Sequence, residues 1–336
     1  MGEKNDVFCA WLEKAEIFSD FMNGAMFAGK QKILPGELKP ARGDYLEKEK
    51  KRGEAGTAAR RRRSRDVVKK RCMGGSYCVL AVENQAELHY AMPVRCMEYD
   101  AMEYTSQLRR IRERHRRNKD LKGSAQFLSG MTREEKLDPV TTLVFYHGEG
   151  EWDACRDLHD MLDFTGENEI FRKYTANYRI NLVTLADLQE EQFKTGLREV
   201  IGMMKRGRDK NAMREYCRKN EERFRRLDEE TYDVISVMIH HRKLEDYKEN
   251  CRVEKGRIDM CQALEEMMED SRQEGRQEGR QEGRQEGLLD GEKRLADLVS
   301  MLLTTGRVED IRKAMDNSEF RRELYRECGI DGESGE

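Results

Sequence analysis

The chain has 336 residues, with 38% charged and 37% hydrophobic side chains and a net charge of −3, a composition typical of an α/β domain with extended polar helices. No apolar run approaches the ~20 residues of a membrane span, and residues 1–20 lack the apolar core of a signal peptide. The nine scattered cysteines favour reduced thiols over a disulfide framework or a zinc site, so we expect a cytoplasmic protein without a membrane partner.

The first half of the chain predicts an ordered series of elements. Apolar residues at helical spacing predict a helix over residues 7–29, and residues 39–62 are polar and expected to be irregular. Residues 76–85 have the β-branched and aromatic side chains of a strand. Pro93 begins a helix that runs to about Arg117.

Two further strands complete this half. Residues 140–146 form an almost continuous apolar run that is typical of a buried central strand, and residues 178–185 give another. We predict an α/β domain over residues 1–190, in which helices flank a mixed sheet, followed by an all-helical C-terminal region.

The C-terminal region divides into a helical part over residues 191–270, a repeat segment over residues 271–290 and a helical segment over residues 291–336. Arg-Gln-Glu-Gly occurs four times from Arg272 to Gly287, with Arg and Glu two or six positions apart, so no ion pairs support a helix there. Each glycine also costs roughly 1 kcal/mol relative to alanine. A partner helix could stabilise the segment, which suggests a homo-oligomer through the C-terminal helices; a low-complexity linker is the alternative.

Positive charge is concentrated in two parts of the first half. Lys39 to Arg71 contains fourteen Lys or Arg against five Asp or Glu, and Arg109 to Lys122 contains eight against two. Such segregation indicates a polyanionic partner. For each cluster alone, a solvated loop or helix face is an equally good interpretation.

A candidate site comes from the hairpin around the two glycines at positions 74–75. If they form a tight turn, paired residue numbers sum to 149 and Asp66 lies opposite Glu83. Like charges about 5 Å apart across two strands are destabilising unless a divalent cation offsets them. Gln85 points to the same face as Glu83. Two carboxylates in this arrangement can hold Mg²⁺ or Mn²⁺; the alternative is an exposed, solvated pair.

The residues around this pair carry a family resemblance. Asp66 followed by Glu83-Asn84-Gln85 resembles the PD-(D/E)XK phosphodiesterase core in its Glu-X-Gln variant. Over residues 7–190 the chain resembles the Rpn/YhgA-like family of recombination-promoting nucleases and transposases. The segments that carry this likeness are Phe18–Asn23, Arg65-Asp66, Val82–Gln85 and His89–Asp100.

This resemblance implies a restriction-endonuclease-like fold and a Mg²⁺-dependent DNA endonuclease associated with recombination or mobile elements. Asp66 and Glu83 would bind the metal, and Gln85 would take the catalytic position where most of the superfamily has lysine. Glutamine can orient water and donate a hydrogen bond, but it brings no charge. Asp20 matches the position of a further acidic residue in the superfamily. It either binds the metal or is a solvated residue that caps local structure.

Arginines near these motifs are candidates for contacts to DNA. Arg95 and Tyr99 share a helix face, where they either contact the phosphate or Gln85, or pack on the helix surface. The DNA-binding residues that we predict are Arg61, Arg62, Arg63, Arg95, Arg109 and Arg110.

Two other functions are weighed against the endonuclease. The first is a catalytically inactive DNA-binding or assembly protein whose helical tail forms an oligomer. The second is a transposase that performs strand transfer, which would have to recognise the ends of its element. It ranks lower because the sequence contains no helix-turn-helix or zinc-finger pattern.

Overall fold

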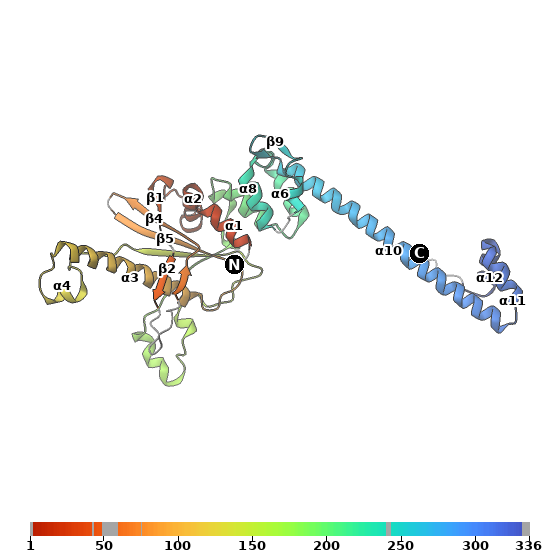
Figure 1. Ribbon diagram of the computed structural model, residues 1–336, viewed down its shortest axis with the longest axis horizontal. Coiled ribbons are helices and arrows are strands. Elements are labelled where there is room, and N and C mark those ends of the chain that lie inside the picture. The colour runs from red at the N-terminus through yellow and green to blue at the C-terminus, as the bar shows by residue number, and fades with distance from the viewer. Residues whose placement is uncertain (1–2, 42–43, 49–59, 75, 240–242, 331–336) are drawn as a thin grey trace. The chain divides into compact units, whose positions relative to one another are not determined.

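The computed structural model describes residues 3–41, 44–48, 60–74, 76–239 and 243–330, and residues 3, 4, 44–48, 60–64 and 76 by their backbone alone. The chain divides into two compact units, residues 1–265 and 266–336, coloured red to blue-green and blue in Figure 1. The first unit therefore extends beyond residue 190, where the sequence suggests that the α/β domain ends. Within the described part of the chain, no helix is both long and apolar enough to cross a membrane.

The first unit is built on a five-stranded mixed sheet, as predicted, so the α/β class is confirmed. The strand order is β1-β4-β5-β6-β7, with β1, β4 and β5 antiparallel and β5, β6 and β7 parallel. Figure 1 labels β1, β4 and β5. The strands are β1 (Leu38–Pro40), β4 (Val67–Met73), β5 (Ser76–Gln85), β6 (Val140–Tyr146) and β7 (Asn181–Thr184).

The predicted register of the central hairpin is confirmed. β4 pairs with β5 from Val67 opposite Val82 to Met73 opposite Ser76, so every residue pair sums to 149. Gly74 has a φ of 56°, a left-handed conformation that glycine adopts without steric cost. Because β4 begins one residue after Asp66, the same register places Asp66 opposite Glu83 at the end of the hairpin.

Helices cover both faces of this sheet. On one face, α1 (Glu3–Leu12) and α2 (Ala15–Phe27) bring Phe8 and Phe21 to Phe145, with ring centroids 5.6 and 5.1 Å away. On the other face, the long helix α3 (Met92–Asn118) packs Met92 and Cys96 against strand β6. The expectation of a single helix over residues 7–29 was wrong. The chain turns at residues 13–14, and the turn allows both phenylalanines to reach the same strand.

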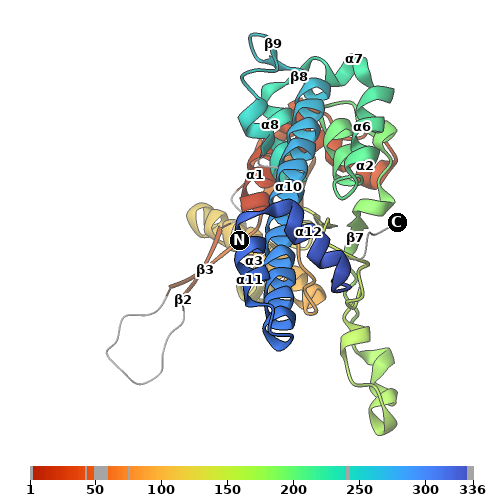
Figure 2. The ribbon, with the colours of Figure 1, turned by 90° about the vertical axis from the view of Figure 1, so that its right-hand side faces the viewer.

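Residues 39–62 contain strands, which corrects the prediction of an irregular stretch. Leu38–Pro40 pairs with β4, and β2 (Asp44–Lys48) pairs with β3 (Arg60–Ser64); Figure 2 shows β2 and β3 side by side. Polar sequences such as these have little strand propensity. Their backbone hydrogen bonds come from partners distant in sequence, which a local pattern does not reveal.

The rest of the first unit is helical, with one small sheet. Helices α5 and α8 contact each other, and they also contact α2 and α1 respectively. The small sheet, in the order β8-β10-β9, corrects the prediction of an all-helical region from residue 191. These elements, with the short α4, are α4 (Ser124–Ser129), α5 (Leu197–Met204), α6 (Lys210–Lys219), α7 (Glu221–Phe224), α8 (Glu229–Met238), α9 (Lys243–Tyr247), β8 (Leu227–Asp228), β9 (Arg252–Glu254) and β10 (Arg257–Ile258). Short 3₁₀ helices lie at Pro35–Glu37, His159–Met161, Gly166–Tyr174, Leu185–Asp187 and Glu190–Gln192.

The RQEG repeat lies within a continuous helix, α10 (Met260–Thr304), which ends against α11 (Val308–Asp316) and α12 (Ser318–Glu327). Leu298 and Leu302 of α10 pack with Ala314 and Leu324 of the two short helices. Helix formation is cooperative, and a helix nucleated in the flanking segments can propagate through weak residues. This accounts for helical structure in a stretch that should be unstable alone. The homo-oligomer stays a prediction.

Candidate functional site

The hairpin brings Asp66 and Glu83 together at the end of β5. The side chain of Glu83 is fully buried. One carboxylate oxygen of Asp66, Oδ2, accepts a hydrogen bond of 2.7 Å from the backbone N–H of Asn84, the residue that follows Glu83. The alternative of a solvated pair therefore does not apply, because the two carboxylates lie in a largely desolvated environment.

Two arginines from different parts of the chain face Glu83. Arg65 Nε lies 3.7 Å from Glu83 Oε1, and Arg95 Nη2 on α3 lies 3.3 Å from Glu83 Oε2. The Tyr99 ring has Arg65 Cζ at 5.4 Å and Arg95 Cζ at 5.7 Å from its centroid. Arg95 and Tyr99 thus share a helix face directed at the site, as their spacing predicted.

A second layer of polar residues holds Arg65. The Arg65 guanidinium pairs with Asp100, and its Nη2 donates to Thr142 Oγ1 at 2.7 Å. Thr142 donates to Asp100 Oδ1 at 2.7 Å, and the Tyr178 hydroxyl donates to Asp100 Oδ2 at 2.6 Å. Each oxygen of the Asp100 carboxylate is therefore satisfied, which fixes the orientation of Arg65 against Glu83.

Burial and mutual repulsion control the protonation of the two acids. Burial, followed by the Asp66 charge, raises the pKa of Glu83 to about 8, although Arg95 and Arg65 act in the opposite direction. Burial also raises the pKa of Asp66, against the hydrogen bond from Asn84. Both shifts favour the protonated carboxyl forms when no cation is bound. A divalent ion would favour the ionised form of both carboxylates.

The donor set fits a magnesium-type ion better than zinc. Among residues that the structure describes, none donates a hydrogen bond to the buried Glu83 Oε1, and Asn84 Oδ1 is likewise without a donor. The described ranges contain no group of three or more His, Cys, Asp or Glu residues arranged to hold a metal. Mg²⁺ is commonly held by one or two carboxylates together with waters and substrate phosphates, whereas structural zinc requires four protein ligands.

Gln85 and His147 meet at the end of the sheet. Gln85 is half-buried two residues beyond Glu83, and its backbone carbonyl accepts a 3.0 Å hydrogen bond from the His147 N–H. The His147 ring packs against Phe145 and Phe8, at centroid distances of 5.5 and 6.4 Å. His147 therefore belongs to the aromatic layer that covers the sheet beside the site.

Asp20 is engaged in a different set of contacts. Its carboxylate accepts backbone hydrogen bonds from Lys194 at 2.9 Å and Thr195 at 2.8 Å, and a further bond from the Thr195 hydroxyl at 2.7 Å. These donors immediately precede α5. The arrangement favours the capping alternative for Asp20, since its oxygens already hold the loop that leads into this helix.

The six predicted DNA-binding arginines are distributed over two elements. Arg95 lies at the carboxylate pair, whereas Arg109 and Arg110 lie in the C-terminal half of α3, where Arg110 pairs with Glu103 at 3.0 Å. The other three, Arg61, Arg62 and Arg63, belong to β3, and their side chains lie outside the described part of the structure.

Several residues of the site carry no assigned role in the sequence analysis. Asp100 lies within the motif that follows the hairpin, but Thr142 and Tyr178 come from β6 and the approach to β7, and no local pattern marks them. His89 precedes α3; its buried Nδ1 accepts no hydrogen bond from any residue described, and burial, with Arg95 nearby, lowers its pKa. His89 lies between the motif residues 83–85 and 92–95, and this position is a signal that could have identified it.

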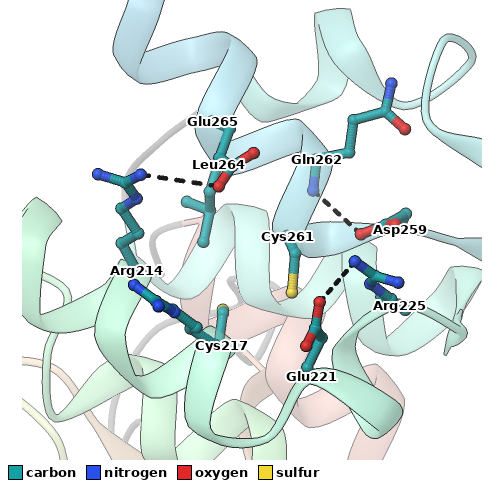
Figure 3. Close-up of a pocket in the computed structure, with 10 residues that line it drawn as sticks. Arg214, Cys217, Glu221, Arg225, Asp259, Cys261, Gln262, Leu264 and Glu265 are labelled. Atoms are coloured by element: carbon teal, nitrogen blue, oxygen red, sulfur yellow. Dashed lines mark hydrogen bonds and ion pairs between the residues drawn. The ribbon is translucent and has the colours of Figure 1, made fainter.

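A separate cavity of about 280 Å³ contains none of the predicted site residues (Figure 3). Two of its arginines are paired with carboxylates, Arg225 with Glu221 at 2.5 Å and Arg214 with Glu265 at 3.8 Å. Its charged groups largely satisfy one another, so the carboxylate pair on the hairpin is the better candidate for chemistry.

Comparison with known proteins identifies the family. Residues 68–233 match a family model described as "Putative transposase, YhgA-like". The match contains Glu83, Gln85 and Arg95, and it begins two residues after Asp66. No curated protein and no solved structure was found to match the chain. Through residues 68–233, the chain belongs to the putative transposase, YhgA-like family.

Proposed function

We propose that this protein is a metal-dependent DNA endonuclease that hydrolyses phosphodiester bonds and takes part in recombination or the movement of mobile elements. The observation that carries the proposal is the pair of desolvated carboxylates, Asp66 and Glu83, at the end of a β-hairpin. Glu83 Oε1 is buried without a hydrogen-bond donor among the described residues. The family assignment supports DNA as the substrate.

Asp66 and Glu83 would hold Mg²⁺ or Mn²⁺. The chemistry that such an ion supplies, when bound, is activation of water and stabilisation of charge on the phosphate. Gln85 would orient the attacking water through its amide. Arg95 would supply the positive charge that glutamine lacks at the position of the usual lysine. Its side chain is 28% exposed and lies 3.3 Å from Glu83, so it can reach a phosphate at the mouth of the site.

The test is cleavage of supercoiled plasmid by the full chain with Mg²⁺, with Mn²⁺ and with EDTA. Glu83→Gln keeps the shape of the buried side chain and removes its charge, and we expect it to lower the nicking rate by roughly 10³-fold. Asp66→Asn should have a similar effect. Glu87→Gln is the matched control, because Glu87 is exposed two residues beyond Gln85 and should leave the rate unchanged. Full cleavage by both site variants would refute the proposal.

A second candidate is a DNA-binding protein in which the nuclease site has lost its activity. The contacts of Arg65 and Arg95 with Glu83 favour it, since two cations already lie against the carboxylate that a metal would bind. This function predicts salt-sensitive DNA binding that EDTA leaves unchanged, and no cleavage with either metal.

A further inference from the structure

The C-terminal end of α3 and the helix α4 enclose a groove of about 790 Å³ that is separate from the carboxylate pair. Arg109, Arg112 and Arg116 lie three and four residues apart, so they line one face of α3. From the opposite side, α4 contributes Phe127 and Leu128, which are 68% and 89% exposed. The groove therefore combines an exposed aromatic ring with a row of cations.

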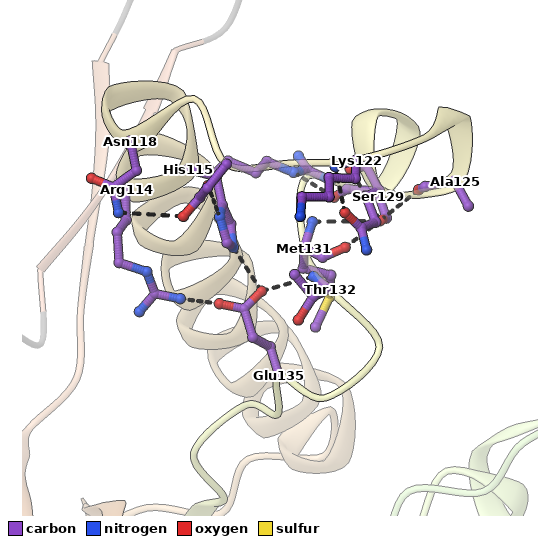
Figure 4. A network of polar contacts seen from close by, with 12 residues as sticks. Arg114, His115, Asn118, Lys122, Ala125, Ser129, Met131, Thr132 and Glu135 are labelled. Atoms are coloured by element: carbon purple, nitrogen blue, oxygen red, sulfur yellow. Dashed lines mark hydrogen bonds and ion pairs between the residues drawn. The ribbon is translucent and has the colours of Figure 1, made fainter.

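Polar contacts hold α4 in place against α3 (Figure 4). The His115 ring on α3 contacts Asp120 at 2.6 Å and Glu135 at 2.8 Å, and Glu135 also accepts a 2.8 Å hydrogen bond from the backbone of Thr132. Arg112 Nε donates to the carbonyl of Ser129, the last residue of α4, at 3.0 Å. Exposure of Phe127 is thus imposed by a connected network on both sides of the short helix.

The cations of the groove remain available to a ligand. Of the residues described in the structure, none forms an ion pair with Arg109, Arg116 or Lys119, and Glu113 is the one carboxylate that lines the groove. Neighbouring arginines on other faces of α3 are engaged, since Arg110 pairs with Glu103 and Arg114 with Glu135. Free positive charge is therefore concentrated on the face that bears the aromatic ring.

We propose that this groove binds a single-stranded segment of nucleic acid, with Phe127 stacked on a base and Arg109, Arg116 and Lys119 in contact with backbone phosphates. A duplex offers phosphates but keeps its bases stacked internally, whereas unpaired bases stack on exposed aromatic side chains next to cations. At 1.5 Å per helical residue, the groove begins roughly 20 Å along α3 from Arg95. The inference rests on the proposed function in that the strand bound here would extend from the DNA at the carboxylate pair.

The test is fluorescence anisotropy in EDTA with a labelled oligothymidylate and a blunt duplex of equal length. The full chain carries Glu83→Gln, so that binding is measured without cleavage. We expect Phe127→Ala to weaken binding of the single strand by roughly 5- to 100-fold. Phe127→Trp should retain it, because indole stacks at least as well. Phe171→Ala is the matched control, since Phe171 is an exposed phenylalanine elsewhere in the same unit.

Paired substitution of Arg116→Gln and Lys119→Gln should reduce the salt dependence of single-strand binding by about 0.7 for each lost phosphate contact. Unchanged single-strand affinity in Phe127→Ala would overturn the proposal. An equal loss of duplex affinity would also overturn it, as would equal displacement of the oligonucleotide by polyglutamate, which carries charge without bases. These outcomes are independent of plasmid cleavage, so failure here and failure of the endonuclease proposal are distinguished.

Discussion

Arginine and glutamate occur together in two regions of this molecule. In one region they meet in the protein interior, and in the other their spacing keeps them apart on the surface of a helix. At the carboxylate pair, Arg65 and Glu83 come from different segments and meet with both side chains fully buried. In the RQEG stretch of α10 the two residue types alternate every two positions, and their side chains are exposed. A helix brings residues three and four apart together, and not residues two apart. Pairing thus depends on spacing and topology far more than on composition.

An Arg→Gln substitution in each region gives the largest expected difference in the free energy of unfolding. Arg65→Gln would remove the buried cation that faces Asp100 and Glu83, and we expect it to lower the free energy of unfolding by about 3–5 kcal/mol. Arg276→Gln in the repeat should change it by less than about 0.5 kcal/mol, because that side chain is exposed. Chemical denaturation followed by circular dichroism measures both values.

Arg65→Lys serves as the control for charge alone. It keeps the positive charge but replaces the planar guanidinium that faces Asp100, Thr142 and Glu83 with a single ammonium nitrogen, so its loss of stability should lie between the other two. Similar losses for Arg65→Gln and Arg276→Gln would contradict the comparison, since they would mean that the buried network contributes no more than a solvated side chain.

Substitution of the glycines in the repeat gives the next largest expected change in stability. A Cβ atom added at Gly275, Gly279, Gly283 or Gly287 would meet no heavy atom within 4 Å. Each change to alanine should therefore stabilise the helix by about 0.5–1 kcal/mol. Far-UV circular dichroism on heating should show the helical signal of the fourfold Gly→Ala variant persisting to higher temperature.

Sedimentation velocity on the same fourfold variant tests the homo-oligomer. The four repeat glycines are spaced four residues apart and form a ridge along α10. If a second chain packs against this glycine ridge, methyl groups there would prevent close approach. The variant would then dissociate at concentrations where the natural chain is associated. A gain in helicity with an unchanged sedimentation coefficient would instead contradict packing through this ridge. The repeat would then be a solvated helix, in full contrast to the buried site.

What could be predicted from the sequence follows the same distinction between local and distant contacts. Two adjacent glycines fix a hairpin register, so the opposition of Asp66 and Glu83 followed from spacing. Arg95 lies in the first turn of α3, the next element after β5, so its approach to Glu83 also follows from a short stretch of sequence. The approach of Tyr178 to Asp100 depends on how β7 joins the sheet, and β2 and β3 pair across a long connection. Neither of these two contacts leaves a periodic signal in the sequence, so both could be identified only from the folded structure.

His115 is intermediate in character between the two cases, because its side chain is buried while its partners Asp120 and Glu135 are more exposed and lie in the segment that follows α3. The hydrogen bond to Asp120, and then that to Glu135, raises the pKa of His115 above its ordinary value near 6.5. Stability from a raised histidine is complete below the unfolded value and is lost as pH rises through the folded value. His115→Gln should therefore lower Tm more at about pH 6 than at about pH 9, where neutral imidazole has lost one donor. Differential scanning calorimetry of both proteins at the two pH values measures this, and Arg117→Gln, an exposed position in the last turn of α3, is the control. A Tm difference independent of pH would mean that the ring holds α4 by packing alone, as an apolar side chain would.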